Sequence, residues 1–344
     1  MVLQLPAFMS NIQSGRCYYL DLAKVITAFL VIYGHLFSDD SKFRLYLYAF
    51  HMPFFFLVSG IFHKYQGKIN WGRYIKSILW PVAIFIGLLV TTNSLFYGTP
   101  FGEQLVIFAV SIIKGDIRGI LWFLIALFWC KVFLDVSCGF KTLIIPFLIW
   151  VVLLFLPLGL KFRLPFELSN GMMAFPFYAV GFYCKDFFLK KNESIRWGIP
   201  FVVFLIIMIL ITHINGRVSM INLQFGTLEK TLFGDEMNSL SSFSRLLLKG
   251  AKVLLFYLNG FIGSFMILSL SLMPIPKTSF ITSLSKSLIT VLGTQSLFVR
   301  PITQHLGYDN GYLLSSLLSV GIFLLCFALH KVLLPAYTII NRHK

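Results

Sequence analysis

The chain contains a succession of apolar runs, each about long enough to cross a lipid bilayer as a helix. A transmembrane helix needs about 20 mostly apolar residues, because the hydrocarbon core is roughly 30 Å thick and each helical residue rises 1.5 Å. Hydrophobic residues make up 58% of the chain and charged residues only 12%, unlike soluble domains. The runs predicted as spans are 19–37, 46–63, 74–96, 118–136, 142–160, 172–190, 196–214, 247–272, 281–302 and 312–336. The sequence therefore predicts an all-α polytopic membrane protein with about ten transmembrane helices.

The connections between these runs predict one domain over residues 1–344. Residues 102–115 are apolar but too short to cross, so we expect an interfacial or re-entrant helix there. Residues 215–246 form the longest connection and are expected to be an extracytoplasmic loop. The first 18 residues lack the pattern of a cleavable signal peptide, so the first span is expected to remain.

The positive charges indicate how the helices sit in the membrane. More of the 29 Lys and Arg residues fall on one side of the predicted spans than on the other, which predicts that both termini are cytoplasmic. The net charge of +16 is spread over short loops, so the expected partner is the bilayer surface rather than nucleic acid. The five cysteines show no CxxC or other metal-type spacing, and no metal site is expected.

The first span carries three ionisable residues, Asp21, Lys24 and His35. Such groups are costly at membrane depth and are therefore functional candidates. Lys24 and His35 are eleven residues apart, which places them on one helix face about 16 Å apart. A groove between them would hold an extended molecule. The alternatives are that Lys24 extends to the headgroups, Asp21 caps the helix and His35 bonds a neighbouring helix.

A second histidine, His51, opens the next span across a short loop, at the same predicted depth as His35. Pro53 is tolerated in a first helical turn, and Ser59 with Gly60 permits close contact between helices. For His51, a packed and hydrogen-bonded side chain is one interpretation, and a role at a site is the other.

Five motifs together resemble the integral-membrane acyltransferase family 3, and in particular its fucose 4-O-acetylase-like sugar acetylases. They are a basic residue and a histidine separated by ten residues (Lys24, His35), FHMPFFFLVSG at 50–60, LWFL at 121–124, MAFPFYAVGFY at 173–183 and LGTQSLF at 292–298. Two positions depart from the family pattern. The basic residue of the family is usually arginine, whereas this chain has lysine at position 24. The late motif of the family usually continues to an aromatic residue and a histidine, whereas this chain continues to Arg300 and Pro301.

The resemblance implies transfer of an acyl group, commonly acetyl, from cytoplasmic acetyl-CoA to a hydroxyl of a cell-surface or lipid-linked glycan. It also implies a multi-pass protein of a bacterial inner membrane, with polysaccharide-assembly proteins as possible partners. His35 is the expected general base, with Asp39 or Asp40 orienting its ring. The expected contacts to the donor are Asp21, Lys24, Lys64, Arg73 and Lys76, and those to the acceptor are His51, Trp122, Glu167, Asn170 and Arg300.

Several alternatives stay open from the sequence. Trp122 has a second interpretation as an aromatic residue of the membrane interface, and Glu167 and Arg300 as solvated loop charges. An acyl-histidine intermediate would serve as well as direct transfer. The rival functions are a transporter or flippase for lipid-linked glycans, which would have a similar number of helices, and an accessory protein without chemistry.

Overall fold

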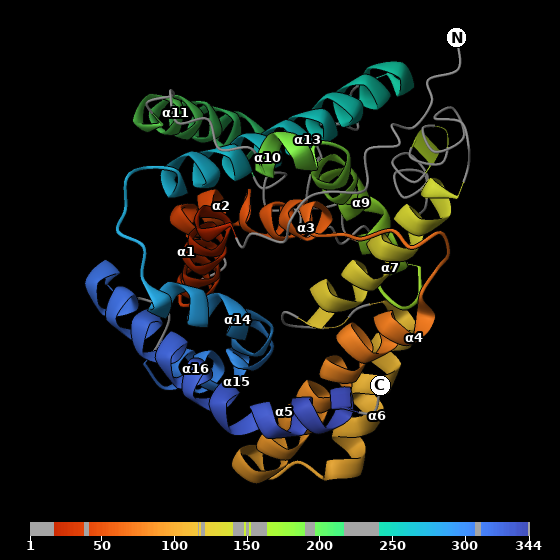
Figure 1. Ribbon diagram of the computed structural model, residues 1–344, viewed down its shortest axis with the longest axis vertical. Coiled ribbons are helices and arrows are strands. Elements are labelled where there is room, and N and C mark those ends of the chain that lie inside the picture. Colours follow the sequence, from red (N-terminus) through yellow and green to blue (C-terminus); the bar gives the residue numbers. More distant parts are fainter. Residues whose placement is uncertain are drawn as a thin grey trace. The chain divides into compact units, whose positions relative to one another are not determined.

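The computed structural model describes residues 17–37, 41–115, 117, 121–139, 148, 151–152, 164–189, 197–216, 241–306 and 311–342. These residues form helices and their connections (Figure 1). The chain divides into two compact units. Unit 1 consists of Met1–Cys17, Met52–Glu193 and Ile221–Val253, and unit 2 of Tyr18–His51, Ser194–Met220 and Leu254–Lys344. Each unit is described by itself.

The helices of unit 1 follow the predicted runs closely. They are α3 (His51–Ile61, in unit 1 from Met52), α4 (Trp71–Tyr74), the π-helix η1 (Ile75–Leu79), α5 (Trp80–Tyr97), α6 (Phe101–Lys114), α7 (Leu121–Cys138), α9 (Leu168–Tyr183) and α10 (Lys185–Leu189). Pro81 stands in the first turn of α5, where a missing N–H is tolerated, and left-handed Gly98 ends the helix. The short run at 102–115 forms α6, whose 14 residues bury no side chain.

The helices of unit 2 come from both ends of the chain. They are α1 (Tyr18–His35), α2 (Lys42–Tyr48), α11 (Gly198–Asn215), α13 (Ser242–Ser271, in unit 2 from Leu254), α14 (Ser279–Thr294), α15 (Ser296–Leu306) and α16 (Tyr312–Arg342). Helix α13 begins within the predicted loop 215–246, so that loop ends before Ser242. The rest of the predicted loop lies largely outside the described residues.

Six helical segments of the described part are long and apolar enough to span a membrane: Lys42–Ile61, Trp71–Tyr97, Leu121–Cys138, Gly198–Asn215, Gly250–Ser271 and Tyr312–Leu333. The predicted number of ten is therefore not confirmed. Helix α1 is absent from the six because Asp21, Lys24 and His35 lower its hydropathy. The run 172–190 turns at Cys184 and the run 281–302 breaks at Gln295, so each yields two shorter helices. Residues 142–160 lie mostly outside the described residues.

Large apolar side chains are exposed along the outer helices. Examples on α11 are Ile199, Leu210 and Ile214, and examples on α16 are Leu313 and Leu317. Contiguous apolar surface of this kind is rare on soluble monomers but is the required surface toward lipid. The chain is therefore a multi-pass membrane protein.

Close approach of α3 and α9 depends on two glycines in unit 1. A Cβ on Gly60 would collide with the carbonyl oxygen of Tyr178, and a Cβ on Gly181 would collide with the carbonyl oxygen of Leu57. The predicted role of Gly60 in helix contact is thus confirmed. Small residues are the usual means by which membrane helices bring their backbones together.

Contacts at both ends of unit 1 show that α7 and α9 run in the same direction. At one end, Phe166 N–H donates to the carbonyl of Ile112 (3.0 Å), and Ile117 N–H donates to the Glu167 carboxylate (2.8 Å). Asp135, near the other end of α7, joins a hydrogen-bond network that contains Tyr178 of α9.

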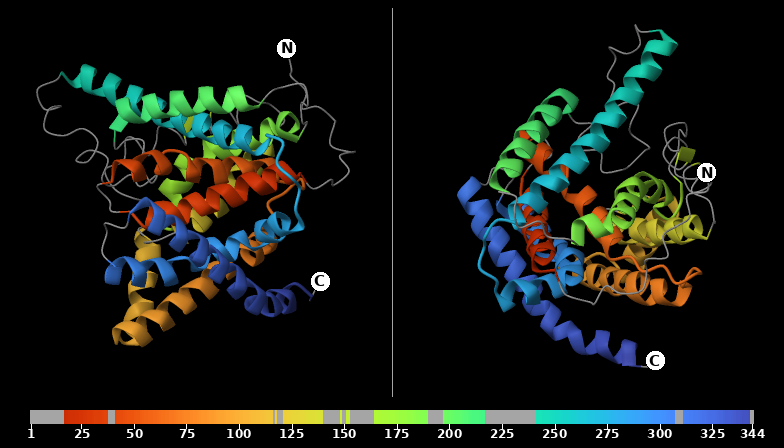
Figure 2. Two further views of the ribbon diagram at one scale, coloured as in Figure 1. Left: turned by 90° about the vertical axis from the view of Figure 1, so that its left-hand side faces the viewer. Right: turned by 45° about the horizontal axis from the view of Figure 1, so that its top comes forward.

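In unit 2, α14 lies parallel to α1 (Figure 2). Tyr18, at the start of α1, donates its hydroxyl hydrogen to the carbonyl of Pro276 (3.0 Å) and accepts from the N–H of Thr278 (3.1 Å). Further along both helices, the Ser285 hydroxyl donates to Asp21 (2.6 Å). The long helix α16 covers α14, where the side chains of Thr290 and His330 meet at 2.8 Å.

Replacing Gly60 with alanine is expected to lower the stability of the fold. The added methyl group forces α3 and α9 apart, and overpacking of this kind costs about 1–3 kcal/mol. The measurement is the midpoint of thermal unfolding in detergent. Gly87→Ala in α5 is the control, because a Cβ there meets nothing within 4 Å. Equal midpoints for the two variants would contradict the close contact.

Candidate functional site

Polar and ionisable side chains gather in two places, one in each unit. In unit 2 they are His35, Tyr48 and His51, at the end of α1 and on the α2–α3 segment. In unit 1 they surround Asp135 near the end of α7. The sequence interpretation named the first group only in part and did not name the second.

The two histidines of unit 2 meet on the ring of Tyr48. His35 Nδ1 lies 2.6 Å from the Tyr48 hydroxyl, and the two rings pack edge to face. The His51 ring packs on the same tyrosine with centroids 4.6 Å apart. His35 and His51 thus come together within unit 2 as predicted, with Tyr48 between them. The side chain of His35 is half-buried, whereas His51 is only 2% exposed.

A backbone hydrogen bond decides the tautomer of His51. Its Nδ1 lies 2.8 Å from the carbonyl oxygen of Leu47. A carbonyl can only accept, so Nδ1 carries the hydrogen and the neutral ring presents its lone pair on Nε2. His51 is thus both packed and hydrogen-bonded, as one interpretation expected, and it keeps one nitrogen as an acceptor.

Arg44 adds a positive charge to this group. Its guanidinium lies 4.6 Å from the centre of the Tyr48 ring and donates to the carbonyl oxygen of Phe37 (3.2 Å). Arg44, Tyr48 and His51 follow one another at intervals of four and three residues, which places them on one helical face. That spacing was the sequence signal for Arg44 and Tyr48, neither of which was among the predicted site residues.

Asp21 and Lys24, in the first two turns of α1, form an ion pair of 2.8 Å. The carboxylate is 3% exposed and also accepts the Ser285 hydroxyl hydrogen. The Lys24 side chain is 21% exposed. Both side chains therefore have a structural partner. A contact between Lys24 and the acyl donor would have to form while Lys24 is paired with Asp21.

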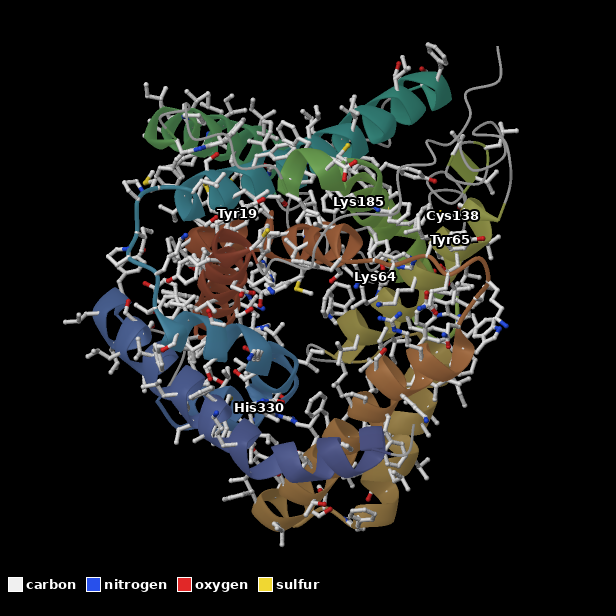
Figure 3. The ribbon with its side chains drawn as sticks, viewed as in Figure 1. Tyr19, Lys64, Tyr65, Cys138, Lys185 and His330 are labelled. Atoms are coloured by element: carbon white, nitrogen blue, oxygen red, sulfur yellow. The ribbon has the colours of Figure 1, made fainter. Side chains whose placement is uncertain are left out.

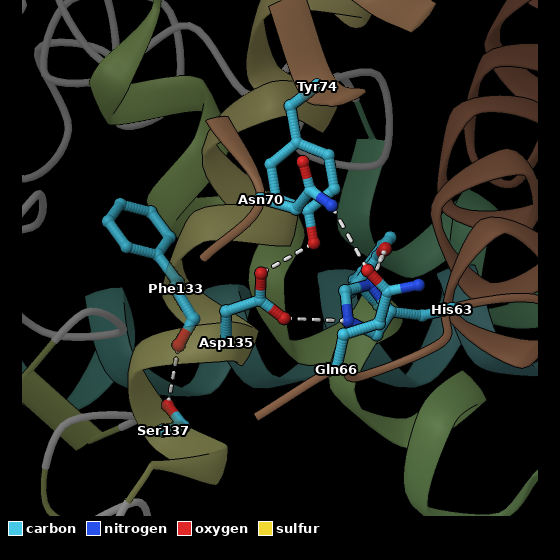
Figure 4. Close-up of polar contacts among 8 residues, drawn as sticks. His63, Gln66, Asn70, Tyr74, Phe133, Asp135 and Ser137 are labelled. Atoms are coloured by element: carbon cyan, nitrogen blue, oxygen red, sulfur yellow. Dashed lines mark hydrogen bonds and ion pairs between the residues drawn. The ribbon is translucent and has the colours of Figure 1, made fainter. Parts of the chain in front are cut away.

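The second group is a buried network in unit 1 that joins α4, α7, α9 and the segment just after α3 (Figure 4). His63, just after α3, places Nε2 3.0 Å from Asp135 Oδ1 and Nδ1 2.8 Å from the Tyr178 hydroxyl. The Tyr74 hydroxyl of α4 donates to Asp135 Oδ2 at 2.5 Å. The side chains of the histidine–carboxylate pair are each 1% exposed. Both carboxylate oxygens of Asp135 are thus committed to neighbours.

Basic and polar side chains surround this network. Lys64 and Tyr65 follow α3, Cys138 ends α7 and Lys185 begins α10 (Figure 3). Burial raises the pKa of the Tyr65 phenol, and the nearby Cys138 and Asp135 raise it further. The predicted donor residues Lys64, Arg73 and Lys76 are exposed in the same unit.

The predicted acceptor residues of unit 1 are buried rather than solvated. Trp122 packs against Phe56 and Phe123, with ring centroids 6.3 and 6.4 Å away. Glu167, 1% exposed, accepts from the N–H of Ile117 and from the Asn170 amide. The interpretation of Glu167 as a solvated loop charge is therefore wrong.

Asn170 retains an unused acceptor. Its Oδ1 is buried and has no hydrogen-bond partner among the described residues of the chain. Three predicted site residues remain. Arg300 lies exposed on α15, and Asp39 and Asp40 lie outside the described residues.

Asp135 could have been found from the sequence, whereas its contact with His63 could not. Lys131 and Asp135 interrupt an apolar run in the way that Lys24 and His35 do, and the cost of charge in lipid applies equally to them. The contact between His63 and Asp135 spans 72 positions of sequence, so only the folded structure brings the pair together.

These features define a helical membrane protein with ionisable side chains held at helix ends. A family described as an acyltransferase domain matches residues 18–331, nearly the whole chain. The chain therefore belongs to acyltransferase family 3, and membrane acyltransferase activity follows from that membership. No curated protein and no solved structure matches it.

Removing the carboxylate of the Asp21–Lys24 pair is expected to be strongly destabilising. Asp21→Ala leaves a largely buried ammonium without this partner, at a typical cost of about 3–5 kcal/mol. The double variant Asp21→Ala/Lys24→Met is expected to recover most of the loss, because it removes both charges. Thermal unfolding in detergent measures both. If the double variant is less stable than Asp21→Ala, the two side chains do not stabilise each other, which would contradict the pairing.

Proposed function

We propose that the chain is an O-acyltransferase that moves an acetyl group from acetyl-CoA to a hydroxyl of a cell-surface or lipid-linked glycan. The observation that carries the proposal is the half-buried His35, held by the Tyr48 hydroxyl beside His51. A sugar hydroxyl is a poor nucleophile at neutral pH, so an imidazole that removes its proton supplies the needed catalysis. The motif resemblance to fucose 4-O-acetylase-like enzymes supports a sugar acceptor.

In the proposed reaction His35 acts first as a base and then as an acid. When Nδ1–H donates to Tyr48, Nε2 is free to take the hydroxyl proton as the sugar oxygen attacks the thioester carbonyl. The carbon–sulfur bond then breaks, and the imidazolium returns the proton to the leaving thiolate. The products are the acetyl ester and CoA with its thiol, so no proton is gained or lost overall.

The neighbours of His35 have supporting roles in this proposal. Tyr48 orients the imidazole, as the carboxylate does in a serine-protease triad. The Nε2 lone pair of His51 accepts a hydrogen bond from the sugar. Arg44 stabilises the negative charge that develops on the thioester oxygen.

The remaining acceptor contacts are proposed from burial and hydrogen-bonding capacity. Trp122 offers an aromatic ring to an apolar sugar face, and the unused Oδ1 of Asn170 accepts a sugar hydroxyl hydrogen. Glu167 positions Asn170 through their shared hydrogen bond. Arg300 remains a proposed contact because it is exposed on α15.

The donor is proposed to approach from the opposite, cytoplasmic side. Lys64, Arg73 and Lys76 are exposed cations suited to the phosphates of CoA. Lys24 adds a charge in unit 2 beside Asp21. The proposal further assigns both termini to the cytoplasm of a bacterium, the glycan to the outer side of the inner membrane, and the role of partners to polysaccharide-assembly proteins.

Replacing His35 with glutamine is expected to lower kcat by about 10²–10⁴-fold, because general-base catalysis contributes that much. The assay supplies purified, reconstituted protein with labelled acetyl-CoA and a glycan acceptor, and follows both CoA release and ester formation. His213→Gln is the control, since His213 is exposed near the end of α11. Equal kcat for wild type and His35→Gln would exclude His35 as the base. Loss only in His51→Gln would transfer the role to His51.

Tyr48→Phe tests the orienting hydrogen bond. It keeps the ring that packs on both histidines and removes only the hydroxyl. The expected result is a fall in kcat of about tenfold, which corresponds to about 1.4 kcal/mol for one hydrogen bond, with KM for acetyl-CoA unchanged. A change in KM alone would show that Tyr48 binds substrate instead.

A further inference from the structure

We infer that Arg73 and Lys131 of unit 1 form a phosphate-binding site, and that the buried network around Asp135 holds that site in shape. Within the proposed function, on which this inference rests, the ligand is the phosphate-bearing part of the acyl donor. Lys131 and the network residues His63, Tyr74 and Asp135 were not among the residues expected from the sequence.

Lys131 forms no direct ion pair with a described residue, and the negative charge of Asp135 acts on it only from beyond ion-pair distance. It lies in the apolar helix α7 and is half-buried, with its ammonium 5.3 Å from the centre of the Tyr74 ring. No carboxylate of the described part of the chain lies within ion-pair distance of it. A desolvated cation without a counter-ion is costly, so binding of an anion there is favourable.

The nearest candidate counter-ion is already committed elsewhere. Asp135 follows Lys131 by four residues, a spacing that commonly forms an ion pair on a helix. Its Oδ1 instead lies 3.0 Å from His63 Nε2, and its Oδ2 accepts from Tyr74 at 2.5 Å. The network therefore keeps this carboxylate out of a direct ion pair with Lys131, although its negative charge still acts on the ammonium at longer range.

A second cation is close by. Arg73 stands next to Tyr74 on α4, its side chain is exposed, and its charge acts on Lys131. Two like charges repel unless an anion lies between them, and a phosphate matches both, since guanidinium offers a fork and ammonium a point charge. No acidic partner of the Arg73 side chain is found among the described residues.

The backbone of this region has an unusual geometry. Tyr74 is followed directly by the π-helix Ile75–Leu79, in which each turn is wider than in an α-helix. Short π-helical turns occur frequently at functional sites. Tyr74 thus has two tasks in the inferred site: its hydroxyl ties α4 to Asp135, and its ring lies against the Lys131 ammonium.

Donors with different phosphate content test the inference. They are acetyl-CoA, acetyl-dephospho-CoA, which lacks the 3′-phosphate, and S-acetylpantetheine, which has no phosphate. Lys131→Met is expected to raise KM for acetyl-CoA at least tenfold, with kcat and KM for S-acetylpantetheine unchanged. Lys131→Arg is expected to restore a low KM. Lys114→Met, at the end of α6, is the control.

The response to acetyl-dephospho-CoA shows which phosphate is bound. If Lys131→Met raises KM for acetyl-dephospho-CoA only slightly, the site binds the 3′-phosphate. If it raises this KM as much as it raises KM for acetyl-CoA, the site binds the diphosphate. An equal rise in KM for S-acetylpantetheine would overturn the inference, because it would show a structural defect. Unchanged KM for all three donors would overturn it as well.

Tyr74→Phe and Asp135→Asn test the positioning network. Each is expected to raise KM for acetyl-CoA severalfold and to leave KM for S-acetylpantetheine unchanged. Loss of kcat with every donor would contradict a positioning role and would indicate that the network only supports the fold. Thermal unfolding of each variant in detergent separates a folding defect from either result.

Direct binding separates this inference from the proposed reaction. Calorimetric titration of the purified protein with CoA needs no turnover, and Lys131→Met is expected to weaken binding at least tenfold in maltoside detergent. If wild-type protein binds CoA in this way but transfers no acetyl group, the proposed reaction fails while the site stands. If Lys131→Met changes only the retention of phospholipid, the phosphate belongs to lipid and the inference fails.

Discussion

The high cost of an uncompensated charge in hydrocarbon constrains every polar feature of this protein. Asp21 pairs with Lys24 and accepts from Ser285, and Asp135 is held by His63 and Tyr74. Each buried carboxylate thereby gains the partners that a low-dielectric surrounding demands. Lys131 has no ion pair among the described residues of unit 1 and lies instead over the Tyr74 ring, which is why we propose that it binds an anion.

The same constraint separates the polar groups of unit 1 along its helices. Glu167 and Asn170 lie at the start of α9, and Tyr178, a member of the Asp135 network, lies about 16 Å further along. Between them α9 is apolar, and the close approach of α9 to α3 through Gly60 and Gly181 lies at Tyr178 and just beyond it. A rigid apolar layer with a polar group at each end suits an enzyme that meets a charged donor on one side and a glycan on the other.

Much of the fold could be predicted from hydropathy, because membrane helices must satisfy their backbone groups internally and expose apolar side chains. The number of spans could not, since Asp21, Lys24 and His35 lower the hydropathy of α1, and Gln295 interrupts a continuous apolar run. The short loop between the first two predicted spans correctly indicated that His35 and His51 come together. It did not reveal Tyr48 as the group between them, because the interpretation treated the loop and the α2 turn only as a connection. The His63–Asp135 contact depends on tertiary packing over a long sequence separation, which no local pattern encodes.

The central claim is that donor and acceptor meet through the protein from opposite sides of the membrane. Proteoliposomes of uniform orientation, with labelled acetyl-CoA on one side and a glycan acceptor on the other, test it most directly. The account predicts labelled ester on the acceptor when acetyl-CoA faces the side that bears Arg73 and Lys131, and none when the two substrates are exchanged. Ester formation only when both substrates share one side would contradict it.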